Sequence, residues 1–259
     1  MTRAFALFSV LAAAFTCYSQ SVTVQPSTIS GIEIIGPQAP DFAASVAQIV
    51  GTDQPGNLTA WLPYGVVVKN NSPQALAAMT VVWTETLDAG PLRPVQRDYW
   101  SWFNAPLKYV QPGSAVLAIP QNMLQQPRNL TAFSAGRGLG NLPNFQRAQR
   151  IEVALDGVVF ASGQFAGADT YSAYEEYQAQ IDVPRSVATT VLEKKATSPI
   201  SDILAWLQLL SASRGGDFTA QRSGSMARQL LGVYSRKGEA ALYSLAQSIL
   251  QEPAFPLHR

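Results

Sequence analysis

Alternating hydrophobic and polar positions predict β-strands in the first two thirds of the chain. Residues 64–70 predict a strand, residues 71–74 a turn, and residues 76–87 a return strand. Two sets of residues alternate along the return strand: apolar Met79, Val81 and Trp83, and polar Thr80, Thr84 and Thr86. This alternation is typical of an antiparallel sheet with one face toward a core and the other toward solvent.

The clearest local signal lies further along the chain. The apolar runs 150–155 and 158–162 are separated by Asp156-Gly157, a pair that favours a two-residue hairpin turn because both positions need a positive φ. Residues 115–119 and 130–133 predict shorter strands. Short strands separated by Pro, Gly and Asn are typical of a sandwich or a barrel.

The strand–turn–strand segment 64–87 resembles the immunoglobulin-type modules of exported proteins. The resemblance covers only this segment and implies an antiparallel β-sandwich. No functional residue is taken from it.

The pattern changes to helical spacing near Gly167. Apolar stripes at intervals of three and four residues predict about four helices after this point. We expect Pro184 to interrupt the first helix, Ser198-Pro199 to begin the second, and the segment 253–259 to form a short flexible tail. The expected class is α+β, with an antiparallel immunoglobulin-like β-sandwich over residues 20–167 and a helical domain over residues 168–259.

The first 19 residues have the layout of a secretory signal peptide. Arg3 supplies a positive charge, residues 4–15 are almost entirely small or apolar, and small residues precede a cleavage point between Ser19 and Gln20. The apolar run is shorter than the roughly 20 residues of a membrane span. We therefore expect an exported protein, periplasmic or extracellular, without a transmembrane segment.

Cys17 offers a second interpretation of the signal, as the lipidated cysteine of a bacterial lipoprotein. The preceding Phe15 and Thr16 are bulkier than the residues that such a signal carries at these positions. We therefore expect cleavage of the signal and no lipid anchor.

The composition argues against several kinds of chemistry. Hydrophobic residues make up 47% of the chain, charged residues 14%, and the formal net charge is +1, so no strong overall field attracts nucleic acid. Cleavage of the signal removes the only cysteine, and the only histidine, His258, lies in the tail. We expect no disulfide, no Ser-His-Asp triad, no metal centre and no cofactor.

Charge is segregated between two consecutive stretches of sequence. Residues 89–150 hold seven basic residues and one acidic residue, whereas residues 151–182 hold six acidic residues and no basic one. The two stretches either face each other or form separate solvated surfaces, where each ion pair contributes only about 0–1 kcal/mol. Arginine among aromatic residues also suits phosphates, sugars or nucleic acid, but export and the lack of a motif argue against nucleic acid.

Residues 99–103 read Tyr-Trp-Ser-Trp-Phe. In a strand Trp100 and Trp102 share one face, and Tyr99 and Phe103 share the other. Either both faces are buried, or the two tryptophans form an exposed platform for a sugar or a partner protein. The predicted contact surface consists of Arg97, Tyr99, Trp100, Trp102 and Arg137.

Arg137 lies in the glycine-rich segment 135–141. This segment lacks the glycine spacing of a dinucleotide site and the Gly-Lys-Ser/Thr of a phosphate loop. It predicts a flexible loop in which glycine permits a close approach of the backbone to a ligand.

An enzyme made from these residues would depend on carboxyl groups. A glycosidase needs two, one as the acid and one as the base or nucleophile. Glu175 and Glu176 are adjacent and point apart on a helix, so they cannot form the pair together. One of them could act with Asp169, Asp156 or Glu152, and the candidates are Glu152, Asp169 and Glu175.

The sequence therefore favours an exported binding or structural protein without catalytic activity, with a protein or a glycan as its partner. The alternative is a carboxylate-dependent hydrolase that acts on an extracellular polymer such as a glycan. A cleft with paired carboxyl groups would favour the enzyme, and an aromatic surface would favour the binding protein.

Overall fold

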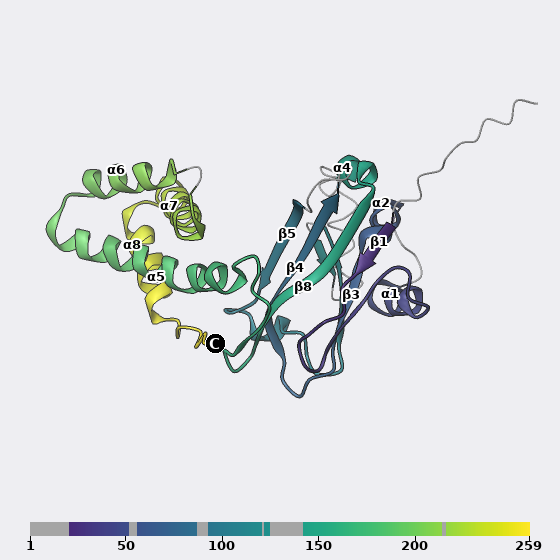
Figure 1. Ribbon diagram of the computed structural model, residues 1–259. Coiled ribbons are helices and arrows are strands. Elements are labelled where there is room, and N and C mark those ends of the chain that lie inside the picture. Colours follow the sequence, from purple (N-terminus) through teal and green to yellow (C-terminus); the bar gives the residue numbers. More distant parts are fainter. Residues whose placement is uncertain (1–20, 52–55, 87–92, 121, 125–141, 214–215) are drawn as a thin grey trace, which may run out of the picture.

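Two β-sheets occupy the first part of the chain and helices the last part (Figure 1). The computed structural model describes residues 21–51, 56–86, 93–120, 122–124, 142–213 and 216–259, and within them it has a mixed α+β structure with seven α-helices. The helices of the first part are α1 (Phe42–Val50), α2 (Gly56–Trp61) and α4 (Leu142–Arg147), with the short 3-10 helices η1 (Leu62–Tyr64) and η2 (Pro106–Lys108).

The larger sheet has five strands in the order β1-β8-β4-β5, with β9 paired to β8. Its strands are β1 (Ser21–Val24), β4 (Leu76–Thr86), β5 (Arg93–Ser101), β8 (Arg150–Phe160) and β9 (Phe165–Gly167). All pairs are antiparallel except β1 and β8, which are parallel. The expected purely antiparallel arrangement is therefore wrong at β1, because strands so far apart in sequence are not held antiparallel by a hairpin.

The second sheet has the order β2-β3-β6-β7, and all its pairs are antiparallel. Its strands are β2 (Ile32–Ile35), β3 (Val66–Asn70), β6 (Ala115–Ile119) and β7 (Asn122–Leu124). The predicted strands 64–70 and 76–87 exist as β3 and β4, but β4 is not a return strand beside β3. The two lie in different sheets, which lets the apolar residues of both face one core.

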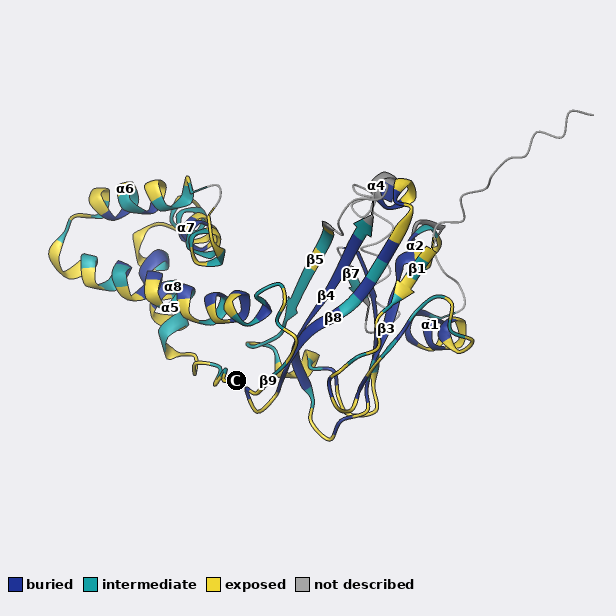
Figure 2. Ribbon diagram, in the orientation of Figure 1, coloured by how far each residue is buried: buried dark blue, intermediate teal, exposed yellow. Residues whose placement is uncertain are grey.

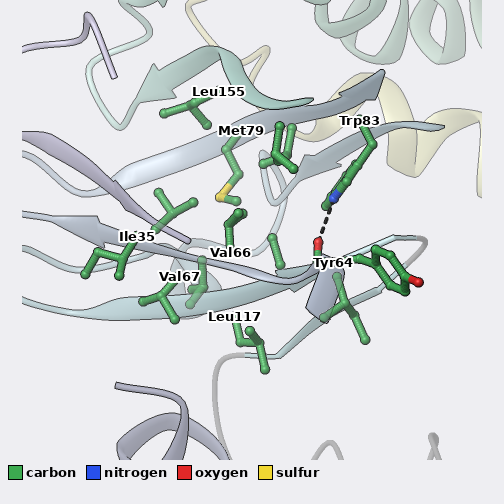
Figure 3. Close-up of a cluster of buried hydrophobic side chains, with 14 of the residues drawn as sticks. Ile35, Tyr64, Val66, Val67, Met79, Trp83, Leu117 and Leu155 are labelled. Atoms are coloured by element: carbon green, nitrogen blue, oxygen red, sulfur yellow. Dashed lines mark hydrogen bonds between the residues drawn. The ribbon is translucent and has the colours of Figure 1, made fainter. Parts of the chain in front are cut away.

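One hydrophobic core receives side chains from both sheets (Figure 3). Met79 and Trp83 of β4 are fully buried in it, together with Val66 of β3 and Leu117 of β6. The indole Nε1 of Trp83 donates a hydrogen bond to the backbone carbonyl of Tyr64 at 2.8 Å. The predicted inward face of β4 is therefore confirmed.

The outer face of β4 does not meet solvent as predicted. Thr80 is fully buried, and its hydroxyl lies 2.6 Å from the hydroxyl of Tyr177. Tyr177 belongs to α5 (Ala173–Thr197), whose first turns pack on this face of the sheet. The alternation along β4 is thus real, but α5 covers its polar side at Thr80.

Asp156-Gly157 does not form the predicted hairpin turn, because β8 is one continuous strand through both residues. Leu155 pairs with Val81 and Gly157 with Thr80, so Asp156 is the extra residue of a β-bulge. Glycine is needed here for close packing, because a Cβ on Gly157 would lie only 2.5 Å from the ring of Phe165.

Four helices follow the sheets, as the sequence predicted: α5, α6 (Ile200–Ser211), α7 (Phe218–Lys237) and α8 (Glu239–Gln251). They share their own hydrophobic core (Figure 2). Pro184 does not divide α5. Ala179 and Val183 before the proline and Val187 after it are buried in the same core, and this packing holds the helix together across the missing hydrogen bond.

The C-terminal tail, residues 253–259, returns from α8 to the sheets (Figure 1). The backbone N–H of Phe165 donates to the carbonyl of His258 at 2.7 Å, and the N–H of His258 donates to the carbonyl of Gly163 at 2.9 Å. The ring of Phe255 lies 4.5 Å from that of Phe103. The tail expected to be flexible thus has defined contacts, because its apolar residues find partners on the sheets.

Candidate functional site

The aromatic segment 99–103 forms the end of β5 and the turn after it. Trp100 faces the core between the sheets, where its ring meets that of Trp83 edge to face at 6.4 Å. On the opposite face Tyr99 and Phe103 lie 6.4 and 5.7 Å from the ring of Tyr177 on α5. Both faces are therefore covered, one by the core and the other by α5, and the segment joins the sheets to the helices.

Asp156 holds the segment that connects β9 to α5. Its side chain is almost fully buried, and its two carboxylate oxygens accept hydrogen bonds from the N–H groups of Thr170 and Tyr171 at 2.8 and 3.1 Å. Burial raises the pKa of Asp156, the two N–H groups lower it, and the charge of Asp169 raises it further. The bulge in β8 thus orients a carboxylate that holds this connection.

Two tyrosines complete the junction between the sheets and α5. Burial raises the pKa of the fully buried Tyr177 well above its ordinary value of 10.0, although its hydrogen bond with Thr80 opposes this change. The hydroxyl of Tyr99 donates to the carbonyl of Tyr171 at 3.0 Å, and burial also raises the pKa of Tyr99. Both phenols therefore remain protonated and serve as hydrogen-bonding groups at neutral pH.

A pocket of about 310 Å³ lies where the end of β5, the middle of α5 and the C-terminal tail meet. We call it the tail pocket. Three aromatic residues line it, Trp102 and Phe103 from the segment after β5 and Phe255 from the tail. Ser101, Asn104 and Gln180 add hydrogen-bonding groups, and the remaining part of the wall includes Lys108, Pro184, Arg185 and Glu252.

The charged residues of the tail pocket differ in their surroundings. Arg185 donates hydrogen bonds to the carbonyls of Glu252 and Ile249 at 2.7 and 3.3 Å, so it caps the last turn of α8 and fixes the tail against α5. Lys108 is exposed at the rim, on η2. Glu252 is the only carboxylate among the described lining residues, so the pocket does not offer the pair of acids that a glycosidase needs.

A chain of hydrogen bonds runs from the tail pocket into the helices. The hydroxyl of Ser101 donates to Oε1 of Gln180, whose Nε2 donates to Oε1 of Glu176 at 2.9 Å. Glu176 is almost fully buried and forms an ion pair with Arg222 of α7, whose Nε lies 2.9 Å from the same oxygen. The wall of the tail pocket is thereby connected to α7.

The predicted contact residues do not converge on one surface. Trp102 lines the tail pocket, whereas Trp100 faces the core and Tyr99 faces α5. The guanidinium of Arg97 lies 5.9 Å from the ring centre of Tyr171, at the junction. Arg137 and the rest of the glycine-rich segment, like Cys17 and the signal, lie outside the described residues.

The three candidate carboxylates have separate neighbours. Glu152 of β8 forms an ion pair with Arg150, and Asp169 forms one with Arg259 of the tail at 2.6 Å. Glu175 is exposed on α5 and lines a different hollow, between α5 and α7. Two of the acids therefore serve structural ion pairs, and Asp169 pairs with a base from the tail instead of one from the basic stretch.

Much of the tail pocket could not be predicted from local patterns in the sequence. Gln180, Arg185 and Phe255 come from segments that are about 80 to 150 residues from Trp102 in sequence and meet it only through the path of the chain. A tail rich in apolar residues was a weak hint that it would dock.

No protein-family model, curated protein or solved structure matches this chain. In the described part of the chain no helix is both long and apolar enough to cross a membrane. The described residues also contain no group of three or more His, Cys, Asp or Glu side chains placed to hold a metal ion.

Proposed function

We propose that the protein is exported to the periplasm or the extracellular space and binds a glycan in the tail pocket without catalysing a reaction on it. The observation that carries the proposal is the lining of this pocket, in which the aromatic residues Trp102, Phe103 and Phe255 occur together with hydrogen-bonding side chains. The layout of residues 1–19 supports export.

A sugar fits this combination of groups. One face of a pyranose ring presents C–H groups that pack against an aromatic ring, while its hydroxyls need donors and acceptors around the edge. Asn104 carries an amide that can donate and accept. Gln180 and Ser101 already bond to Glu176 and to each other, which leaves one amide N–H of Gln180 and the lone pairs of the Ser101 hydroxyl for a sugar. The volume of about 310 Å³ lies at the lower end of small-molecule sites, which suits one or a few sugar units better than a flat protein surface.

We infer that the two sheets form an immunoglobulin-like sandwich, since both contribute to one core and the chain crosses between them after β3. Such a scaffold commonly carries its binding residues in the loops and edges rather than in the core, and the tail pocket lies at the end of the edge strand β5.

The test is binding of soluble neutral and acidic oligosaccharides to the mature protein by isothermal titration calorimetry. Asn104→Ala and Phe255→Ala remove a polar and an aromatic part of the lining, and each is expected to weaken binding about tenfold, which corresponds to about 1.4 kcal/mol. Leu107→Ala is the matched control, because Leu107 is fully exposed on η2 beside the pocket and does not line it.

Three results would contradict the proposal. The first is that no oligosaccharide binds, and the second is that both pocket variants bind as tightly as the control. The third is that the protein cleaves the sugars and that Glu175→Gln abolishes cleavage, which would support the hydrolase. Thermal unfolding of each variant shows whether the fold is retained.

A further inference from the structure

A further pocket, lined by polar and charged residues, lies on the helices. Its volume is about 670 Å³, and we call it the α7 pocket. Arg222, Ser225 and Arg228 follow one another at three-residue intervals on α7, so their side chains come from successive turns on one side of the helix. Ser211 and Ser213, at the end of α6 and just after it, form the opposite wall.

The charged side chains of this pocket differ in how deeply they are buried. The side chain of Glu176 is only 6% exposed, whereas that of its partner Arg222 is 41% exposed. The carboxylate therefore lies beneath the guanidinium, and Arg228 is exposed as well. Two guanidinium groups against one carboxylate leave a net charge of +1, with the positive charge nearest to solvent.

Both arginines keep donors for a ligand. A guanidinium has five N–H groups. Arg222 uses Nε and Nη2 for Glu176, and Arg228 uses Nη1 for the carbonyl of Ser211 at 2.9 Å. The same three bonds hold the arginines in place, which reduces the loss of side-chain entropy when a ligand binds. The bond from Arg228 also satisfies a carbonyl at the negative end of α6.

We propose that the α7 pocket binds a tetrahedral oxyanion, a phosphate or sulfate group, between Arg222 and Arg228. Guanidinium groups bind such anions through paired, charge-assisted hydrogen bonds, and the serine hydroxyls supply further donors. The volume of the pocket leaves room for a molecule to which the anion is attached. The proposal does not rest on the glycan site, although the hydrogen bond from Gln180 to Glu176 joins the walls of the two pockets.

Removal of the negative charge of Glu176 should strengthen anion binding. An oxyanion and the Glu176 carboxylate compete for the same guanidinium, so the neutral variant Glu176→Gln should bind the anion more tightly. Its net charge of +2 instead of +1 at the pocket should raise the affinity for inorganic phosphate about threefold to tenfold. A residue that only supports the fold would not produce a gain.

The experiment is calorimetric titration of the mature protein with inorganic phosphate. Chloride in the buffer keeps the ionic strength constant, and a titration with chloride alone is run for comparison. Arg228→Gln is expected to weaken phosphate binding about tenfold. Arg236→Gln is the matched control, because Arg236 is exposed on the same helix and donates to the carbonyl of Gly232 outside the pocket. A phosphate monoester and sulfate, titrated in parallel, show whether the site takes free anions or an anion carried by a larger molecule.

Four results would overturn the proposal: no phosphate binding, equal binding of chloride, equal losses in Arg228→Gln and Arg236→Gln, or weaker binding in Glu176→Gln. Phosphate also stabilises proteins nonspecifically by exclusion from their surfaces, and this effect would be the same in all variants. If Arg228→Gln does not fold, the gain expected for Glu176→Gln still decides the question.

Discussion

The core between the sheets and the junction beneath α5 are both buried, yet they are built differently. The core holds large apolar side chains, and one of its tryptophans, Trp83, makes a hydrogen bond to a backbone carbonyl. The junction instead holds the Thr80–Tyr177 pair, the Asp156 carboxylate and hydrogen-bonded tyrosines. Apolar packing tolerates many geometries, whereas buried hydrogen bonds require one. The core therefore secures the fold, and the junction sets where the helices and the tail lie.

The largest effect is expected in the core. Trp83→Ala removes a fully buried indole, and truncation of a buried tryptophan lowers the free energy of unfolding by about 3–5 kcal/mol. Urea denaturation measures this loss. A loss below about 1 kcal/mol would contradict the assignment of Trp83 to the centre of the core, and Trp206→Ala on the partly exposed α6 serves as the control.

This prediction rests on a part of the fold that the sequence anticipated well. Alternation along 76–87 identified the buried face of β4, and helical spacing identified the four helices. The errors lie where a distant segment decides the local structure. Asp156-Gly157 forms a bulge because α5 and β9 approach it, and Pro184 stays inside a helix because the residues on both sides share one core.

The tail pocket was also predicted only in part, because segments distant in sequence complete it. Trp102 was identified from its neighbours in sequence, because a cluster of aromatic residues is visible locally. Gln180, Arg185 and Phe255 complete the pocket from other segments, and their side-chain types are too common to stand out in one sequence. The charge segregation showed only part of the pairing. Glu152 pairs with Arg150 of the basic stretch, whereas Glu176 and Asp169 pair with bases that follow the acidic stretch, Arg222 and Arg259.

A hydrogen-bond deletion in the junction should have an intermediate effect. Tyr177→Phe leaves the buried hydroxyl of Thr80 without its partner, which lowers the free energy of unfolding by about 1–3 kcal/mol. The double variant Thr80→Val/Tyr177→Phe removes both polar groups and should recover part of that loss. Urea denaturation gives the loss of each variant. If the loss of the double variant equals the sum of the losses of Thr80→Val and Tyr177→Phe, the two hydroxyls do not interact.

The effect of Asp156 on stability should depend on pH, which distinguishes the junction from the apolar core. Its pKa is raised in the folded protein above the ordinary value of 3.8, so the folded state binds the proton more tightly than the unfolded state. This contribution to stability is complete below the ordinary pKa and is lost as the pH rises through the raised pKa. In Asp156→Asn the contribution is absent, and the stability gap between wild type and variant should therefore shrink as the pH rises from acid to neutral.

Urea denaturation of both proteins across this range measures the gap directly. Other carboxylates titrate in both proteins, so their effects largely cancel in the difference. The variant also loses one acceptor for the N–H groups of Thr170 and Tyr171, which changes the stability at every pH but not the direction of the slope. A gap that widens as the pH rises would show that the two hydrogen bonds outweigh burial.

The smallest effect is expected at the end of the tail. Arg259 pairs with Asp169 and lies 4.5 Å from the ring centre of Tyr174, but its side chain is 63% exposed. Arg259→Gln should therefore lower the free energy of unfolding by only about 0–1 kcal/mol. We expect the tail to stay in place, because its backbone bonds to Phe165 and Gly163 do not involve this side chain. Hydrogen exchange of the Phe165 and His258 amides tests this, and faster exchange of both in the variant would mean that the charge, and not the backbone, anchors the tail.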